Sequence, residues 1–144
     1  MQHKDNIDLL NSVVRATEMG KNTLDQMIPM AEKPEFKAEL LKEQRGFRSF
    51  NQKAHAALDA CGARAEGAGT MEKLMSKAGI AGRTLGDKST RNMAERLLEG
   101  SQMGVTECIT SLRDFPKASE GARQMVHELK QVQEEHIENL KRFL

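Results

Sequence analysis

The sequence contains no tryptophan, no tyrosine and only five phenylalanines among its 144 residues. A hydrophobic core must therefore come mainly from leucine, methionine, alanine, valine and isoleucine, and the nine methionines suit irregular gaps between helices. β-Branched residues are sparse, whereas Leu, Glu, Lys, Gln, Arg, Ala and Met dominate. This composition favours helix over strand, and the length suits one domain spanning residues 1–144.

Other absences argue against several classes of function. The formal net charge is only +1, and no basic stripe with interleaved aromatic residues occurs, so we expect no nucleic-acid partner. No apolar run approaches the roughly 20 residues that span a bilayer, and the polar N-terminal stretch lacks a signal-peptide apolar region. The sequence also lacks a nucleophile elbow, a phosphate-binding glycine loop and a zinc-binding cysteine set. We therefore expect a cytoplasmic protein without a membrane partner, whose Cys61 and Cys108 are reduced and structural.

Four long segments have the three–four spacing of apolar residues that is typical of amphipathic helices. They span about residues 6–28, 34–60, 91–113 and 116–143. Pro34 and Pro116 are expected in the first turns of the second and fourth helices. Gly20, Gly100 and Gly104 fall inside helices, where each costs about 1 kcal/mol relative to Ala. We expect close approach of a neighbouring helix to offset that cost, and the alternative is that a ligand or a partner subunit uses the space.

Residues 62–89 differ from the rest, because they hold six of the eleven glycines. Met71, Leu74 and Met75 form one short apolar face there, which predicts a short extra helix that covers one bundle end or makes a contact surface. A connection of this length lets the second helical hairpin begin at the opposite end of the bundle. We therefore predict an all-α, ferritin-like four-helix bundle made of two helical hairpins.

An internal repeat supports two related hairpins. Pro34 and Pro116 are separated by 82 residues, and the same offset places the second-helix stripe onto the fourth-helix stripe, starting one turn before it at Ala118. The second-helix stripe consists of Phe36, Leu40, Glu43, Phe47, Phe50, Ala54 and Leu58. The fourth-helix stripe consists of Ala122, Met125, Leu129, Val132, His136, Leu140 and Phe143.

Each of these two stripes contains one residue that can bind a metal, Glu43 in the second helix and His136 in the fourth. A bundle that binds two irons needs Glu-x-x-His on two helices and a Glu on each of the other two. The fourth helix has Gln133-x-x-His136 and the second has Glu43-x-x-Gly46, so neither completes the motif.

The string QEEHIENLK, residues 133–141, is similar to the last helix of rubrerythrin-type proteins, where Glu-x-x-His is followed by Leu. The segment LLNSVVRATEMGKNTL, residues 9–24, followed by KPEFKAELL, residues 33–41, resembles a bacterial family of uncharacterised four-helix-bundle proteins of the ferritin-like superfamily. This resemblance covers both hairpins but not the glycine-rich link, and it implies a ferritin-like fold. It matches His136 to the motif histidine, with Gln133 in place of the motif Glu. It makes Glu18 a candidate for the first-helix Glu, with Glu99 and Glu107 as alternatives on the third helix.

Replacing Glu by Gln keeps the shape of the side chain but removes its charge. About two carboxylates and one imidazole remain, too few for stable paired iron. We therefore expect no catalytic residue and no resident cofactor, in a non-enzymatic protein that acts by self-association, as a homo-oligomer, or by binding a protein partner. The alternative is a metal-binding protein with a reduced site, in which His136, Glu43 and Glu18 hold iron or another transition metal.

Related hairpins place the second and fourth helices antiparallel, so Glu43 and His136 are expected to face each other at the same height. A hydrogen bond between them would offset the desolvation cost of burying either side chain. The buried carboxylate is also expected to raise the pKa of the histidine.

Overall fold

A computed structural model describes residues 2–63 and 87–144 of the chain. The long helices are α1 (Gln2–Met27), α2 (Pro34–Ala60), α5 (Thr90–Asp114) and α6 (Glu120–Leu140), with short 3₁₀ turns at Ile28–Met30 and Lys141–Phe143. No strand occurs in the described ranges, so the predicted all-α bundle of four long helices is confirmed. The predicted short helix around Met71 lies outside the described residues.

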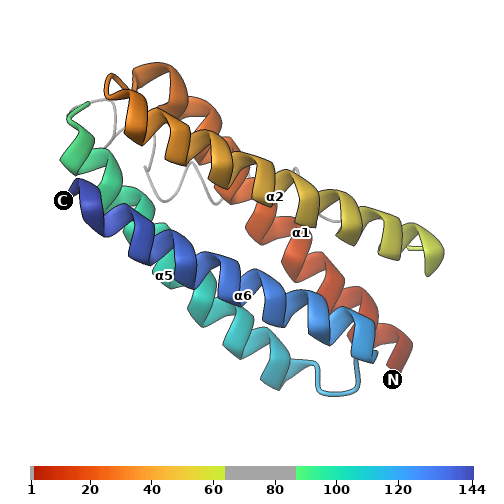
Figure 1. Ribbon diagram of the computed structural model, residues 1–144. Helices are drawn as coiled ribbons and strands as arrows, with labels where there is room; N and C mark the ends of the chain where they lie inside the picture. Colours follow the sequence, from red (N-terminus) through yellow and green to blue (C-terminus); the bar gives the residue numbers. More distant parts are fainter. Residues whose placement is uncertain (1, 64–86) are drawn as a thin grey trace.

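The four helices form two antiparallel hairpins that lie side by side (Figure 1). The first hairpin pairs α1 with α2, and the second pairs α5 with α6. The end of α2 and the start of α5 lie at opposite ends of the bundle, so α2 runs antiparallel to α6 (Figure 1). The backbone N–H of Lys117 donates to Asp5 at 2.8 Å, which ties the α5–α6 loop to the start of α1.

Local sequence features determine where the helices begin and end, and the start of α6 differs from the prediction. Pro34 is the first residue of α2, as expected. A backbone N–H in the first turn has no acceptor within the helix, so proline, which lacks this N–H, breaks no hydrogen bond there. Gly62 takes a positive φ of 72°, which lets the N–H of Ala63 bond the carbonyl of Leu58 and closes α2. The fourth helix does not start at Pro116. It starts at Glu120, because the hydroxyl of Ser119 accepts from the N–H of Ala122 and caps it there.

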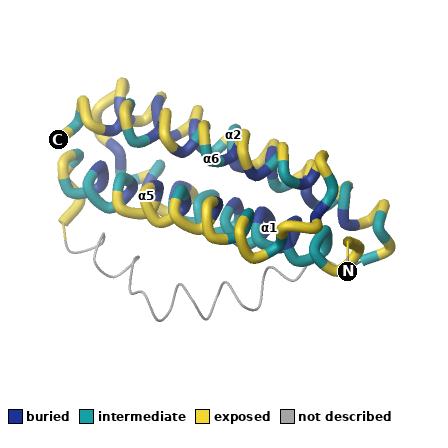
Figure 2. Tube along the Cα trace, turned by 90° about the horizontal axis from the view of Figure 1, so that it is seen from below, coloured by how far each residue is buried: buried dark blue, intermediate teal, exposed yellow. Residues whose placement is uncertain are grey.

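The buried face of α6 is also rotated relative to the prediction, whereas α2 buries the predicted stripe and adds Glu39. Buried residues line the inward side of each helix (Figure 2). On α6 they are Ala122, Val126, Leu129, Gln133, His136 and Leu140. Met125 and Val132, placed inward by the sequence pattern, are only half-buried. Consequently an offset of 86 residues, rather than 82, maps six of the seven α2 stripe residues onto the buried residues of α6. The same offset maps Pro34, the first residue of α2, onto Glu120, the first residue of α6.

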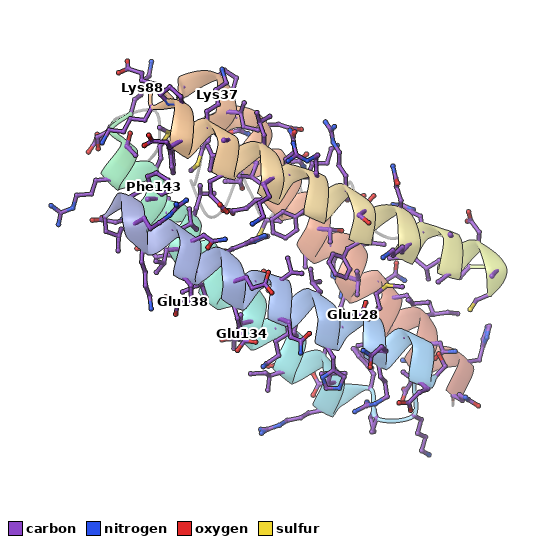
Figure 3. All side chains as sticks on the ribbon, in the orientation of Figure 1. Lys37, Lys88, Glu128, Glu134, Glu138 and Phe143 are labelled. Carbon is purple, nitrogen blue, oxygen red and sulfur yellow. The ribbon has the colours of Figure 1, made fainter. Side chains whose placement is uncertain are left out.

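The opposite side of α6 carries charge. Glu128, Glu134 and Glu138 lie along the solvent side of this helix (Figure 3). Lys130 pairs with Glu134 at 3.3 Å, and Lys141 pairs with Glu138 at 2.9 Å. Across the described residues, every helix is too short or too polar to cross a membrane.

Candidate functional site: a buried polar centre and an adjoining cavity

Glu43 of α2 and His136 of α6 meet in the middle of the bundle. His136 Nδ1 lies 3.7 Å from Glu43 Oε1, and the side chains are only 5% and 2% exposed. The prediction that these residues face each other is therefore confirmed. They meet because α2 and α6 run antiparallel and both side chains lie on the inward stripes.

The contact between these two side chains is not a hydrogen bond. At 3.7 Å it is too long, and neither His136 Nδ1 nor Glu43 Oε2 has a hydrogen-bond partner among the described residues. Burial raises the pKa of Glu43 to about 10, and the neighbouring Glu39 carboxyl adds to that rise. Burial lowers the pKa of His136 to about 4. Near pH 7 the Glu43 carboxyl is therefore protonated and the His136 imidazole is unprotonated, so both side chains are neutral.

The expectation that Glu43 would raise the pKa of His136 is therefore wrong. A carboxyl group raises the pKa of a nearby histidine only when it is ionised, and the buried Glu43 holds its proton. Desolvation is the largest cause for His136, and the opposing influence of Glu39 is smaller. The edge of the Phe47 ring, with its centroid 5.4 Å from the imidazole centroid, adds to the apolar surroundings of His136.

Two further polar residues belong to this centre, and the sequence stripes omitted both. Glu39 lies one turn before Glu43 and is 6% exposed, with its Oε2 unpartnered among the described residues. Gln133 lies one turn before His136 and is 3% exposed, and its Nε2 donates weakly to Cys108 Sγ at 3.7 Å. Glu39 is four residues before Glu43 and Gln133 is three residues before His136, so each lies on the same helix face as a stripe residue. This spacing is the sequence pattern that could have identified them.

Glu18, the third predicted ligand, contacts a different residue. Its Oε1 lies 3.7 Å from Nε2 of His55, and the side chains are partly exposed. Among residues 2–63 and 87–144 no group of three His, Cys, Asp or Glu side chains is close enough to hold a metal ion. The structure thus brings Glu43 and His136 together and places Glu18 beside His55, while a metal role for these residues stays a prediction.

A cavity of about 200 Å³ adjoins the polar centre. It lies between α1 and α5, and Glu43, Phe47 and Gln133 reach it from α2 and α6. Most of its wall is apolar, including Met19, Leu24, Leu97 and Met103. Glu99 and Glu107, the alternative third-helix carboxylates, also line it.

The centre is poor in charged ligands. Glu43 and His136 are neutral near pH 7 and Gln133 is an amide, so Glu39 is the remaining carboxyl group of the four side chains. Such a set offers hydrogen-bonding groups to a bound molecule but little anionic charge to a metal. Comparison with family models, with curated proteins and with solved structures finds no match to this chain.

Proposed function

We propose that the chain is a ferritin-like bundle with a degenerate di-iron site, and that it acts by binding rather than by catalysis. The topology supports the first part, since two antiparallel hairpins whose link joins opposite ends of the bundle are typical of ferritin-like folds. Two thiols without a disulfide, Cys61 and Cys108, support a cytoplasmic setting.

The observation that carries this proposal is the set of side chains at the buried centre. Two ferrous ions bring four positive charges, which bundles of this kind balance with ionised glutamates. Here Gln133 stands at the position of one motif glutamate, and no group of three ligand side chains occurs among the described residues. A centre of this composition favours a structural or binding role over oxygen chemistry.

The proposed partner is a second copy of the chain or another protein. Support comes from α5, where Met103 is 59% exposed and Ile109 is 38% exposed. Light scattering on the purified protein tests self-association, for which we expect a mass above the 16.1 kDa of one chain. The double variant Met103→Gln with Ile109→Gln is expected to lower that mass. A monomer at every concentration would reject self-association.

Metal binding at a reduced site is the second candidate, and the unpartnered polar atoms favour it. Glu39 Oε2, Glu43 Oε2 and His136 Nδ1 are buried without partners among the described residues, and a cation would use such atoms. Carboxylate and imidazole donors suit iron, manganese or zinc. The fit is poor, however, because no three-ligand group occurs in the described ranges.

Metal content of tag-free protein separates the two candidates. Mass spectrometry before and after anaerobic incubation with ferrous iron measures it directly. We expect no bound metal. About one metal per chain, lost in His136→Ala, would establish the reduced site, and about two irons would restore the oxidase interpretation.

A further inference from the structure

The cavity between α1 and α5 is large enough for a small molecule. At about 200 Å³ it exceeds an engineered cavity of roughly 150 Å³ that binds benzene. It is partly open to solvent, since Gly100 and Met103 of its lining are exposed. A largely apolar pocket of this size beside buried polar groups is a candidate binding site.

The side chains around the cavity indicate what kind of molecule it would hold. Met19 and Met103 present thioethers, which contact aromatic rings favourably. The Phe47 ring lies at the inner end and offers an edge or face to another ring. Such a lining suits an aromatic molecule of one or two rings better than an extended polar chain.

Two polar groups of the lining residues lack partners in the described chain. Arg96 Nη2 lies 3.4 Å from Glu99 and 3.7 Å from Glu95, yet its buried Nε has no acceptor. Glu43 Oε2 has no donor. A buried polar group left unpaired costs about 1–3 kcal/mol, so a ligand carrying one hydrogen-bonding group gains by pairing with either.

The charges around the cavity disfavour an anionic ligand. Three carboxyl groups line it, those of Glu43, Glu99 and Glu107. Arg96, also in the lining, is already paired with Glu95 and Glu99. A buried anion would therefore carry its desolvation cost without a free cationic partner in the lining.

We infer that this cavity binds an aromatic molecule of one or two rings that carries a single hydrogen-bonding group and no negative charge. The cavity shares Met103 with the proposed interface and Glu43 with the alternative metal site. Binding of a small aromatic probe is measured directly, so this test can fail while the metal or light-scattering test succeeds, and the reverse.

Indole is a suitable probe, because the chain has no tryptophan or tyrosine and all indole fluorescence comes from the ligand. We expect titration with the full-length protein to raise indole anisotropy and shift its emission to the blue, as burial in an apolar site requires. Phenol is expected to displace indole, and benzoate is expected to compete at least tenfold more weakly than phenol. No anisotropy change at millimolar protein would overturn the proposal, and equal competition by benzoate would overturn the part that excludes an anion.

Gly100 offers a blocking variant with a matched control. A Cβ at Gly100 meets nothing within 4 Å, and this residue lines the cavity, so Gly100→Leu fills space without a backbone clash. Gly46 is also a helical glycine in open space, but it does not line the cavity. We expect Gly100→Leu to weaken indole binding at least tenfold and Gly46→Leu to change it less than twofold, with unchanged helix content in both. Equal weakening in both variants, or none in Gly100→Leu, would contradict the assigned site.

Discussion

The Phe47 ring occupies the space where a side chain of Gly20 would stand. A Cβ atom at Gly20 would lie 2.7 Å from Cε2 of Phe47 and within 2.9 Å of two more ring atoms. Glycine at this position therefore lets α1 approach α2 closely and leaves room for the Phe47 ring, whose centroid lies 5.4 Å from that of the His136 ring. The sequence predicted this role for Gly20, and the structure confirms it.

Substituting Gly20 by alanine is expected to destabilise the protein. The new methyl group must displace a buried aromatic ring, which costs about 1–3 kcal/mol, while the gain in helix propensity is up to about 1 kcal/mol. We expect a net loss of about 1 kcal/mol in the free energy of unfolding, measured by urea denaturation. Gly46→Ala is the control, since a Cβ there meets open space, and it is expected to stabilise by up to about 1 kcal/mol. A stabilised Gly20→Ala would show that Phe47 is not held where the structure places it.

The helices and the Glu43–His136 contact were predictable from the sequence, because both follow from periodicity. Apolar spacing placed the four helices to within a few residues, and antiparallel α2 and α6 placed the two polar residues opposite each other. The predicted 34–60 matches α2 residue for residue. Loop positions were less certain, and Pro116 was mistaken for a helix start because its ring also fits a turn.

The rotation of α6 was not predictable from hydrophobicity alone. Val132 is more apolar than its neighbour Gln133, yet Gln133 is the buried one. The Gln133 side chain fits there because Gly104 of α5 has no side chain. A Cβ at Gly104 would lie 1.7 Å from Gln133 Oε1. The partner that makes room for Gln133 is on another helix, 29 residues away in the chain, so no local pattern reveals it. Close approach of a helix was also expected at Gly100, but a Cβ there would meet nothing within 4 Å, so that expectation was wrong. The alternative, a ligand or a partner subunit in that space, stays a prediction.

Glu43 is expected to make the protein less stable at alkaline pH. Its pKa is about 10 in the fold and 4.5 for an unperturbed glutamate, so above pH 4.5 the unfolded chain releases a proton that the folded protein retains. Stability from this group is therefore full below pH 4.5 and declines as pH rises towards 10, by about 1 kcal/mol per pH unit. Glu43→Gln keeps a neutral side chain of the same shape. We expect the variant to exceed the wild type in stability, by a margin that grows from pH 6 to pH 9.

His136 acts in the opposite direction on the acid side. Its pKa is about 4 in the fold and 6.5 for an unperturbed histidine, so its contribution to stability is lost as pH falls from 6.5 towards 4. Between pH 4.5 and 6.5 the two groups offset each other in the wild type. Glu43→Gln is expected to unmask the histidine, so urea denaturation should show its stability falling below pH 6.5. Equal pH profiles for variant and wild type would mean that Glu43 is ionised in the fold.

Thr17 and Asn51 make a hydrogen bond between α1 and α2 whose loss should be measurable. Thr17 is fully buried, its Oγ1 donates to the Val13 carbonyl at 2.7 Å, and Asn51 Nδ2 donates to it at 3.0 Å. Thr17→Val keeps the shape but removes both bonds, and Asn51 is only partly buried and can turn to water. We expect a loss of about 1 kcal/mol in thermal unfolding experiments. Thr110→Val, on the exposed face of α5, is the control and should change stability by less than half as much.

The two thiols are expected to differ sharply in reactivity, which provides a probe of opening at the polar centre. Cys108 is 5% exposed and burial raises its pKa to about 11, whereas Cys61 is half-buried at the end of α2. Because the thiolate is the reactive form, a disulfide reagent at pH 8 should label Cys61 first and Cys108 only through opening of the fold. In a Cys61→Ser variant only Cys108 can react, so the labelling rate of Cys108 is measured alone. In that background Gly20→Ala is expected to accelerate the labelling of Cys108 because it destabilises the fold, and Gly46→Ala is expected to slow it. Labelling of Cys108 as fast as Cys61 would show that the α5–α6 contact between Cys108 and Gln133 is open in solution.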